Sequence, residues 1–364
     1  MTSPFRSWIE IDRSALRHNV RVAKKCAPQA KIIAVLKANA YGHGITGVAE
    51  ALSSHVAYFA VASLEEALRI REVEKKIPIL LLSAALPSEY AAIAEHGFIP
   101  TISSYEEARL FSKVAPSNAP IDFKINTGMG RLGAFYTEAE KTLAQITALP
   151  LSIQSISTHL PSADSDVSYT RRQLALFKKL LPPLRAWAPK ASVHVLNSAG
   201  LLRFSEHAYD DVRIGLMIYG VAPIASFQKL LRPAMTWKTV ISFITKIPKG
   251  SHISYGGTYQ APHDLTVAIL PVGYGDGYPR QVSGKGAYVL LQGKRAPILG
   301  RVTMDQLIVD ISRIKHVRIG TEVVLLGKQR TQQITATQLA TKAETIAWHL
   351  FTGITERVHR IYTQ

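Results

Sequence analysis

The chain has 364 residues, of which 47% are hydrophobic and 19% are charged. These fractions are typical of a folded globular protein and argue against a largely disordered one. The length allows one large barrel-type domain with a smaller one, or three small domains. Cys26 is the only cysteine, which excludes an intrachain disulfide and a cysteine metal cluster. We expect no bound metal.

The net charge of +17 is large enough that nucleic-acid binding must be considered. Basic residues are scattered in short groups such as Lys24-Lys25 and Arg171-Arg172, with no long basic run interleaved with aromatic residues. This pattern favours solubility or the attraction of small anions over nucleic-acid binding. No apolar run reaches the length of a membrane span, and the N-terminal MTSPFRSWIEID lacks the apolar core of a secretion signal. We therefore expect a cytoplasmic protein with no membrane partner.

The first part of the chain alternates strand-like and helix-like segments. Residues 8–12 alternate like a strand, and residues 13–26 are typical of a helix. Ser63-x-x-Glu66 and Ser104-x-x-Glu107 are capping boxes that predict two helix starts. Apolar, strand-like runs recur at Ile33–Leu36, Tyr58–Val61, Ile77–Leu82, Phe98–Ile102, Ile121–Lys124, Ile153–Ser157, Val193–Leu196 and Val212–Ile218.

This rhythm of strand and helix, repeated eight times over about 200 residues, predicts a closed parallel (β/α)8 barrel within residues 1–230. An open doubly wound sheet is the alternative. The first strand-like run is not followed by G-x-G-x-x-G, which weakens the dinucleotide-binding version of that alternative.

The character of the sequence changes near Leu231. Residues 237–247 alternate on a period of two, and turn signals such as Pro248-Lys-Gly250 follow. Residues 231–364 therefore predict a mostly antiparallel β-domain. One long helix is expected at Ala336–Leu350, with Gly353 as its C-cap. Further strand-like runs lie at Leu265–Val272, Ala287–Leu291, Gln306–Ile311 and Glu322–Leu326.

A lysine ends the first strand-like run of the barrel. Residues 32–36 are apolar or small and lead straight into Lys37, and Asn39, Gly42 and Gly44 follow in a turn-rich segment. An amine at the end of a buried strand must be solvated, paired or removed by chemistry. Lys37 either extends its amine to solvent or is a Schiff-base lysine, whose lowered pKa lets a neutral amine condense with an aldehyde.

Other polar residues also follow barrel strands, where the chemistry of such barrels is located. Lys124 ends the fifth run and leads into a glycine-rich loop that contains Arg131, and His159 follows the sixth. His159 taken alone is equally typical of a hydrogen-bonded barrel histidine. Arg131 and Arg213, the latter in the eighth run, each need an anion or a carboxylate partner.

Small residues follow the seventh and eighth runs, where barrels often bind phosphate. Ser198, Gly200 and Gly215 have the size and the backbone N–H groups for this. Residues 197–200, NSAG, taken alone are more typical of a turn with a helix cap. Their place on the barrel favours phosphate, and a phosphate site opposite a lysine suggests pyridoxal 5′-phosphate.

Eight motifs along the chain carry a resemblance to a known family. They are VLKANAYGHG, TGMGRLG, STHL with AD shortly after, NSAG, VRIGLMIYG, SYGGTY, PVGYGDGYPR and GRVTMDQ, in this order. Together they resemble the alanine racemase family over both predicted domains. The resemblance implies a pyridoxal-phosphate enzyme that interconverts L-alanine and D-alanine and supplies D-alanine for cell-wall peptidoglycan.

The resemblance implies two catalytic bases, Lys37 and Tyr255. One removes the α-proton from one face of a planar intermediate, and the other returns a proton to the opposite face. A tyrosine with an ordinary pKa is a poor base at neutral pH, so Tyr255 needs neighbours that favour phenolate. In the family, a histidine and then an arginine supply them, here His159 and Arg213.

The resemblance also assigns binding roles. Arg213 would face the pyridine nitrogen and disfavour its protonation, and Arg131 would bind the substrate carboxylate. Lys124 matches a lysine that the family often carries as a carbamate, which could hold Arg131. The residues that match cofactor-binding positions are Lys37, Tyr41, His159, Ser198, Arg213, Gly215 and Leu216.

A third group of matching residues lies in the β-domain. Tyr274, Met304 and Asp305 resemble residues at the substrate entrance, and family members place them, with the second base, in the partner's active site. The resemblance therefore implies a head-to-tail homodimer. Glu356 departs from family members that have a tyrosine touching the phosphate, so it is not assigned to the site. Thr303 stands where a cysteine is frequent.

Three alternatives remain open. A non-catalytic pyridoxal-phosphate carrier would lack the β-domain. A decarboxylase of similar architecture would use a cysteine and an acidic partner for the pyridine nitrogen, whereas this chain offers only Cys26 and Arg213. A broad-spectrum amino-acid racemase is the nearest alternative, and such enzymes tend to be exported.

Overall fold

The computed structural model describes residues 5–364. The chain forms two compact units. The barrel unit consists of Ala15–Ala40 and Ile45–Arg232. The C-terminal unit consists of Tyr41–Gly44, Pro233–Gln364 and the described residues up to Ser14. The chain thus passes between the units several times.

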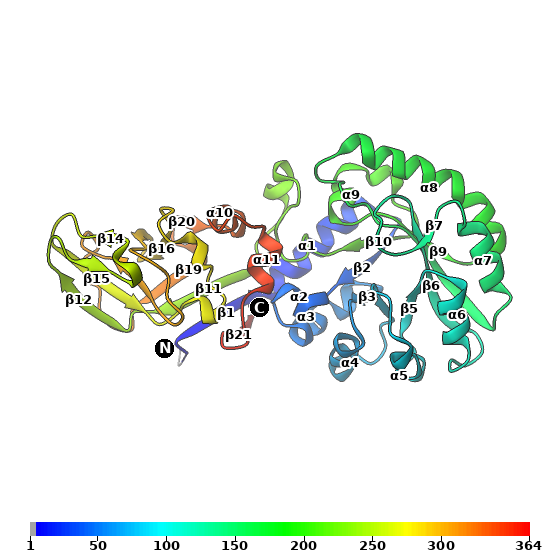
Figure 1. Cartoon of the computed structure of the whole chain (residues 1–364), viewed down its shortest axis with the longest axis horizontal. Helices are drawn as coiled ribbons and strands as arrows, with labels where there is room; N and C mark the ends of the chain where they lie inside the picture. Colours follow the sequence, from blue (N-terminus) through cyan, green and yellow to red (C-terminus); the bar gives the residue numbers. More distant parts are fainter. Residues whose placement is uncertain (1–4) are drawn as a thin grey trace. The chain divides into compact units, whose positions relative to one another are not determined.

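The barrel unit is a closed ring of eight parallel strands (Figure 1). The ring closes because β10 pairs with β2 and β5 pairs with β6. The prediction of a closed (β/α)8 barrel is confirmed, and the open sheet is wrong. The strands, in ring order, are β2 (Lys31–Val35), β3 (Tyr58–Val61), β4 (Ile79–Leu81), β5 (Ile99–Ile102), β6 (Ala119–Asn126), β8 (Leu151–Ser157), β9 (Ser192–His194) and β10 (Asp211–Ile214).

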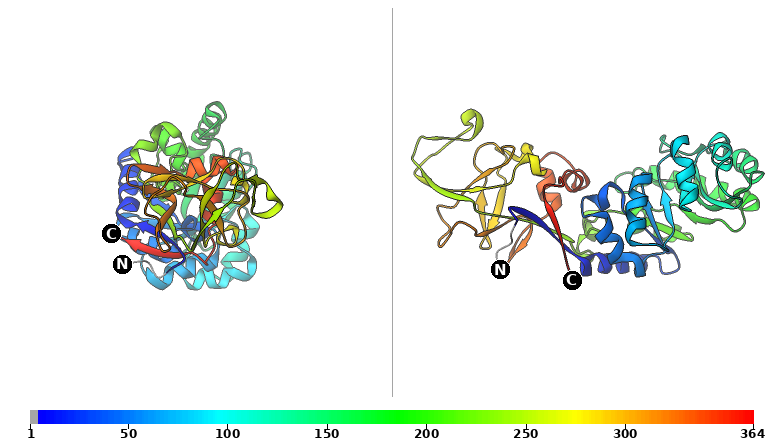
Figure 2. Two further views of the ribbon diagram at one scale, coloured as in Figure 1. Left: turned by 90° about the vertical axis from the view of Figure 1, so that its left-hand side faces the viewer. Right: turned by 90° about the horizontal axis from the view of Figure 1, so that it is seen from below.

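Helices flank the strands of this ring (Figure 2, right). Two of them begin at the predicted caps, because the Ser63 and Ser104 hydroxyls accept from the N–H groups of Glu66 and Glu107. The helices are α1 (Arg13–Cys26), α3 (Ile45–Leu52), α4 (Leu64–Val73), α5 (Tyr90–Glu95), α6 (Tyr105–Ser112), α7 (Ala139–Thr147), α8 (Val167–Trp187) and α9 (Ser198–Arg203).

The C-terminal unit is mostly antiparallel, as predicted. Its largest sheet has the order β17-β16-β19-β11-β1-β21, with β20 paired to β19. The strand predicted at residues 8–12 is β1, which pairs with β11 and β21 in this unit. The strands of this sheet are β1 (Ser7–Asp12), β11 (Met235–Val240), β16 (Tyr288–Leu291), β17 (Lys294–Pro297), β19 (Glu322–Gln329), β20 (Gln332–Ile334) and β21 (His359–Thr363).

Two smaller sheets complete this unit. β12 (Phe243–Ile247), β15 (Leu265–Leu270) and β18 (Leu307–Asp310) form one, and β13 (His252–Ile253) and β14 (Tyr259–Gln260) form the other. The run predicted as one strand at residues 237–247 is therefore two strands in different sheets. The chain changes sheet at Ile241, whose N–H donates to Thr321 O, and at Ser242, whose N–H donates to Ile269 O.

The prediction of one helix at residues 336–350 is wrong. The segment forms α10 (Ala336–Lys342) and α11 (Ala347–Thr352). Between them Glu344 has a φ of 54°, a left-handed conformation that ends a right-handed helix. Gly353 caps α11, but its φ of −77° uses none of the conformational freedom of glycine.

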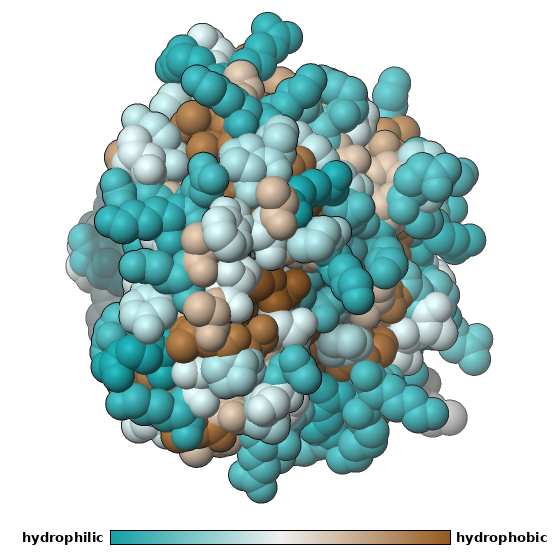
Figure 3. All heavy atoms as spheres, turned by 90° about the vertical axis from the view of Figure 1, so that its right-hand side faces the viewer, coloured by the Kyte–Doolittle hydropathy of each residue, from teal (hydrophilic) through white to brown (hydrophobic). Residues whose placement is uncertain are grey.

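The surface of the molecule is mainly polar where Figure 3 shows it. Hydrophobic residues on this face form small separate groups among hydrophilic ones. Within residues 5–364, no helix combines the length and the apolar composition that a membrane span requires.

Candidate active site

Lys37 follows β2 directly, at the C-terminal end of a buried strand. The next residues form a left-handed turn, α2 (Lys37–Tyr41), in which Ala38, Asn39 and Ala40 have φ values of 52°, 54° and 54°. Lys37 itself is half-buried. Burial and the nearby Arg131 lower the pKa of its amine, and Glu66 opposes them. The amine is therefore more often neutral than that of an exposed lysine.

Arg213 is the most firmly held cation of the barrel. It lies in β10, beside β2, and is 3% exposed. Its guanidinium donates to three backbone carbonyl oxygens, His194 O at 2.8 Å, Thr158 O at 2.7 Å and Val195 O at 3.1 Å. It also contacts the Nδ1 atoms of His194 and His159. Burial lowers the pKa of Arg213 to about 10, so it remains a cation at neutral pH.

A buried carboxylate supports Arg213 through His194. Asp122 in β6 accepts from Ser155 Oγ at 2.7 Å and Ser157 Oγ at 2.8 Å, and its Oδ1 lies 3.2 Å from His194 Nε2. Because a carboxylate only accepts, His194 must carry its proton on Nε2. Its Nδ1 is then the acceptor that faces Arg213. The chain Asp122–His194–Arg213 fixes the orientation of the guanidinium.

Two further basic residues share this space. Lys124 in β6 is 8% exposed, and its Nζ donates to Thr158 O at 3.3 Å. Burial, followed by repulsion from Arg213, lowers its pKa to about 7. His159 follows β8, and its pKa falls well below the usual value because of burial and then four neighbouring cations, Arg213, Lys124, Arg131 and Lys37.

The glycine-rich loop after β6 carries Arg131. Asn126 Oδ1 accepts from the N–H groups of Gly128 and Gly130, both at 3.0 Å, and thereby shapes the loop. Gly133, with a φ of 109°, ends it where a Cβ would collide with the backbone of Asn126 and Ile125. The Arg131 side chain is exposed. Its charge lowers the pKa values of Lys37, Lys124 and His159, so Arg131 lies close enough to all three side chains to affect their protonation.

The predicted phosphate-binding residues lie together after β9 and β10. Ser198 begins α9, and its Oγ accepts from the Gly215 N–H at 3.0 Å. Asn197 Oδ1 accepts from the Gly200 N–H at 2.9 Å and caps the helix, so the turn-and-cap interpretation of NSAG is also correct. Leu216 is 2% exposed. Whether these groups bind phosphate stays a prediction.

The positive charges around His159 indicate that this end of the barrel binds an anionic ligand. Every charged neighbour that shifts the pKa of His159 is a cation. An anionic ligand is favoured in such a field and gains hydrogen bonds from guanidinium and hydroxyl groups. Pyridoxal phosphate with an amino-acid substrate, which together carry a phosphate and a carboxylate, fits this set of residues. Within the described part of the chain, no group of three His, Cys, Asp or Glu residues could hold a metal.

The other predicted residues belong to the C-terminal unit, as does Tyr41. Tyr274 and Met304 lie on adjacent loops, because the Tyr274 N–H donates to Thr303 O at 3.0 Å and the Gly275 N–H to Met304 O at 2.8 Å. Tyr255 is 70% exposed, Met304 53% and Tyr274 40%. Their role beside the barrel residues stays a prediction.

Asp305 has a partner that the sequence did not reveal. Arg357, just before β21, donates to Asp305 Oδ1 at 2.8 Å and lies 3.5 Å from Asp276 Oδ1. The guanidinium thus joins the two loops of the predicted substrate entrance. Glu356 is exposed beside Arg357, and its charge acts on Arg360.

Asp122 and His194 are functional residues that the sequence prediction does not include. A signal was present, because Asp122 and Lys124 alternate with Ile121 and Phe123 in a strand that is buried on both faces. Polar residues two apart in such a strand point into the barrel, and Ser155 and Ser157 repeat the pattern in β8.

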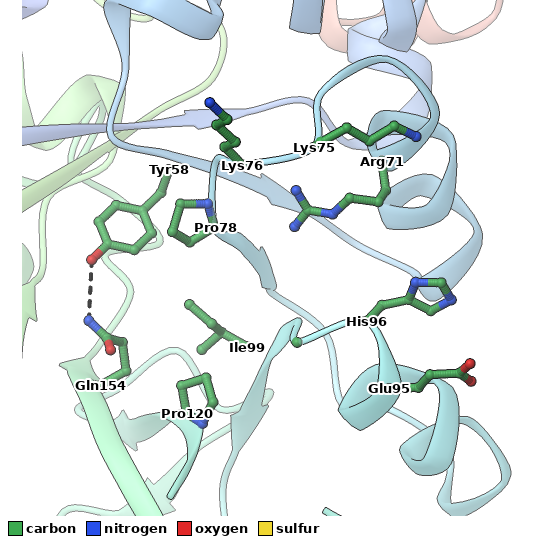
Figure 4. A pocket seen from close by; sticks show the side chains of 11 residues that line it. Tyr58, Arg71, Lys75, Lys76, Pro78, Glu95, His96, Ile99, Pro120 and Gln154 are labelled. Carbon is green, nitrogen blue, oxygen red and sulfur yellow. Dashed lines mark hydrogen bonds between the residues drawn. The ribbon is translucent and has the colours of Figure 1, made fainter. Parts of the chain in front are cut away.

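A separate pocket lies at the opposite end of the barrel (Figure 4). It has a volume of about 530 Å³ and is lined by the starts of strands, including Tyr58, Ile99 and Pro120. Gln154 Nε2 donates to Tyr58 Oη across it at 3.2 Å. None of the predicted site residues lines this pocket.

Family comparisons cover nearly the whole chain. Residues 11–223 match the family described as alanine racemase, N-terminal domain, and residues 234–362 match alanine racemase, C-terminal domain. The alanine racemase of Methylacidiphilum infernorum (isolate V4) is 42% identical over 364 residues, covering 98% of this chain and 92% of the relative.

Solved structures give the same result. The alanine racemase from D-cycloserine-producing Streptomyces lavendulae matches with a TM-score of 0.93 and 32% identity, covering 100% of this chain and 98% of that chain. The Bartonella henselae alanine racemase, solved with covalently bound pyridoxal phosphate, matches with a TM-score of 0.88 and 28% identity. That match covers 99% of this chain and 100% of the other.

Proposed function

The chain belongs to the alanine racemase family, and we propose that it interconverts L-alanine and D-alanine with pyridoxal 5′-phosphate held at Lys37. One observation carries the proposal beyond the family match. A half-buried lysine with a lowered pKa stands at the end of β2, and the charged groups that shift the pKa of His159 in the same barrel are all cations, which favour an anion. The product, D-alanine, would supply cell-wall peptidoglycan.

The bound cofactor would supply an electron sink for the negative charge that develops when the α-proton leaves. Lys37 would hold it, and Arg213 would face its ring nitrogen. A permanent cation there disfavours protonation of the nitrogen, which moderates the electron sink and suppresses side reactions. Tyr41, Ser198, Gly215 and Leu216 would hold the phosphate, and His159 would lie between Arg213 and the second base.

Lys37 and Tyr255 of the partner subunit would move the α-proton. The lowered pKa of Lys37 supports its role, because a neutral amine can accept a proton at neutral pH. Tyr255 would act on the opposite face of the α-carbon. His159 and Arg213 would favour its phenolate form. Neutral His159 can accept a hydrogen bond from Arg213 at Nδ1 and donate one to the phenolate from Nε2.

Arg131 would bind the substrate carboxylate, with Lys124 behind it. Lys124 supports the carbamate assignment by its chemistry. Only a neutral amine adds to carbon dioxide, forming the nitrogen–carbon bond and releasing one proton. Burial lowers the pKa of Lys124 to about 7, so its amine is neutral far more often at neutral pH than that of an exposed lysine.

We also propose a head-to-tail homodimer located in the cytoplasm. Tyr255, Tyr274 and Met304 are large side chains that stay exposed within the C-terminal unit. Exposed apolar groups gathered on neighbouring loops are typical of surfaces that bind a partner or ligand. In the dimer, Tyr274, Met304 and Asp305 would line the substrate entrance of the other subunit.

Measuring D-alanine formation from L-alanine by the purified protein with pyridoxal phosphate tests the proposal. L-serine, L-lysine and L-glutamate serve as parallel substrates. We expect fast conversion of alanine alone. Conversion of several amino acids would indicate a broad-spectrum racemase, and carbon dioxide release a decarboxylase. Cofactor bound at Lys37 without turnover would indicate a carrier and contradict the proposal.

A further inference from the structure

The turn after Lys37 has an unfavourable backbone conformation. Four consecutive non-glycine residues, Ala38 to Tyr41, have positive φ values between 51° and 54°. L-residues avoid this region because Cβ approaches the following carbonyl oxygen, and it usually occurs at single residues. Such a turn persists only where surrounding contacts hold it in place.

Contacts on the barrel side hold this turn. The Ala40 N–H donates to Leu36 O at 2.7 Å. Asn39 Oδ1 accepts from the Ile45 N–H at 2.9 Å, and the Asn39 N–H donates to Glu66 Oε1 at 3.3 Å. The segment that ends the turn and follows it, Tyr41–Gly44, belongs to the C-terminal unit and has contacts of its own.

The last strand of the chain, β21, supplies those contacts. Arg360 Nε donates to Gly42 O at 3.2 Å. The Tyr362 hydroxyl lies 3.0 Å from His43 O and 3.1 Å from Gly44 O, so its single proton is shared between them. Three consecutive carbonyl groups are thus held by two side chains of one strand.

Both side chains that make these contacts are themselves fixed. The other guanidinium nitrogens of Arg360 donate to Thr355 O and Val358 O, both at 2.7 Å, and to Ile354 O at 2.9 Å. The Arg13 guanidinium lies 5.2 Å from the centre of the Tyr362 ring. Because Arg360 and Tyr362 are fixed by these contacts, they restrict the movement of residues 42–44.

Close packing allows the turn little movement. A Cβ added at Gly42 would collide with Phe351 O at the end of α11, and one at Gly44 would collide with the Tyr362 hydroxyl. His43 is fully buried, with its ring edge-to-face against Phe351 at 5.1 Å. Glycine at positions 42 and 44 permits this close approach.

We propose that Arg360 and Tyr362 are positioning residues that clamp segment 41–44, at the end of the left-handed turn and directly after it, and so hold the Lys37 amine in place for the cofactor. This inference rests on the proposed function. Lys37 begins the turn, and Tyr41 ends it, so loosening segment 41–44 frees the lysine through the backbone. The C-terminal strand thereby controls how long the cofactor stays bound.

Tyr362→Phe tests the clamp, because it removes the shared proton and keeps the ring beneath Arg13. Tyr288→Phe is the matched control, since Tyr288 is a half-buried tyrosine of the same unit, with Arg295 4.7 Å from its ring centre. Cofactor release from the holoenzyme is followed by absorbance, with excess inorganic phosphate present to prevent rebinding. We expect release to be roughly fivefold to tenfold faster in Tyr362→Phe. Arg360→Lys should act in the same direction.

Hydrogen exchange supplies a second measurement that does not depend on catalysis. The amides of Ala40 and Ile45 should exchange faster in Tyr362→Phe than in Tyr288→Phe. The Ala57 amide, which donates to Ile32 O in the barrel, should exchange alike in both. Equal exchange at Ala40 and Ile45 in the two variants would overturn the clamp, and faster exchange with unchanged release would overturn its control of the cofactor. A protein that binds no pyridoxal phosphate would refute the proposed function, while exchange would still decide the clamp.

Discussion

Lys124 is a single residue whose protonation the barrel changes strongly. Its pKa of about 7 places a mixture of charged and neutral amine behind Arg131 at neutral pH. The neutral form is the one that can react with carbon dioxide. The same burial that destabilises the ammonium therefore prepares the residue for modification.

We expect a carbamate carbon signal in ¹³C NMR when the protein is equilibrated with ¹³C-labelled bicarbonate at pH 8, and none in Lys124→Met. Lys124→Met should raise KM for alanine roughly tenfold and change kcat less, because Arg131 would lose the carbamate that we propose as its bidentate partner. A carbamate signal that persists in the variant would assign the modification to another residue.

Histidines in the barrel link stability to pH. His159 is held neutral, with a pKa well below the unfolded value of about 6.5. The unfolded chain therefore binds more protons than the native state below that pH. The stability contributed by the neutral histidine is complete above about pH 6.5 and is lost as the pH falls below it.

His159→Asn should therefore flatten the fall in unfolding free energy between pH 6.5 and pH 5.5. One proton fewer corresponds to a slope smaller by up to about 1.4 kcal/mol per pH unit. Urea unfolding at several pH values measures this slope. An unchanged slope in the variant would show that His159 already titrates normally in the native state.

Asp122 affects stability through the groups that it satisfies. Burial alone would raise the pKa of its carboxyl, but His194, Lys124 and Ser155 outweigh burial and lower it below the usual range. Asp122→Asn would leave an amide facing His194 and two serines. We expect a loss of roughly 1–3 kcal/mol in unfolding free energy for each buried donor that loses its acceptor. Ser112→Ala, at the end of α6, removes one part-buried hydroxyl that donates to Arg109 O, and as a control it should cost far less.

Asp122→Asn should also change catalysis through Arg213. If the relay orients the guanidinium, kcat should fall by more than KM rises, even at temperatures where the variant is fully folded. A folded variant with wild-type kcat would show that Asp122 stabilises the barrel without positioning Arg213.

At the scale of elements, the loop after β6 depends on its glycines to different degrees. Gly133 has a φ of 109°, and an added Cβ would collide with the backbone of Asn126 and Ile125. Gly130, on the other side of Arg131, has a φ of 73° and no atom within 4 Å of an added Cβ. Alanine at position 133 would therefore suffer both a steric collision and an unfavourable φ, whereas alanine at position 130 would suffer only the unfavourable φ.

Gly133→Ala should displace the Arg131 loop and raise KM for alanine roughly tenfold or more, with a lower melting temperature. Gly130→Ala should cost about 1–2 kcal/mol, the cost of a left-handed alanine, and change KM little. Steady-state kinetics and thermal unfolding of both variants give the comparison. Equal effects on KM would indicate that collision at Gly133 does not move Arg131.

The elements also show what could be predicted from sequence. Barrel strands are apolar on both faces and separated by capped helices, so their positions were predictable. The break between α10 and α11 was not, because Glu344 carries no signal for a left-handed residue. Asp122 and His194 could not be assigned from the sequence alone, because their roles come from contacts between neighbouring barrel strands. The hydrogen bonds from β21 to residues 42–44 join segments more than 300 residues apart, so no local sequence pattern predicts them.

At the scale of the whole molecule, the proposed function divides the catalytic residues between two subunits. Lys37 belongs to the barrel unit and Tyr255 to the C-terminal unit. In a head-to-tail dimer, each site would combine Lys37 of one subunit with Tyr255 of the other. A heterodimer of Lys37→Ala and Tyr255→Ala subunits would then hold one complete site and one site lacking both bases.

The most direct test is D-alanine formation from L-alanine by this heterodimer, isolated by two different affinity tags, beside the wild type and both parent homodimers. We expect rapid racemisation by the wild type, almost none by either homodimer, and about half of the wild-type rate by the heterodimer. An inactive heterodimer beside an active wild type would contradict the shared site. A wild type that binds pyridoxal phosphate and forms no D-alanine would contradict the proposed function itself.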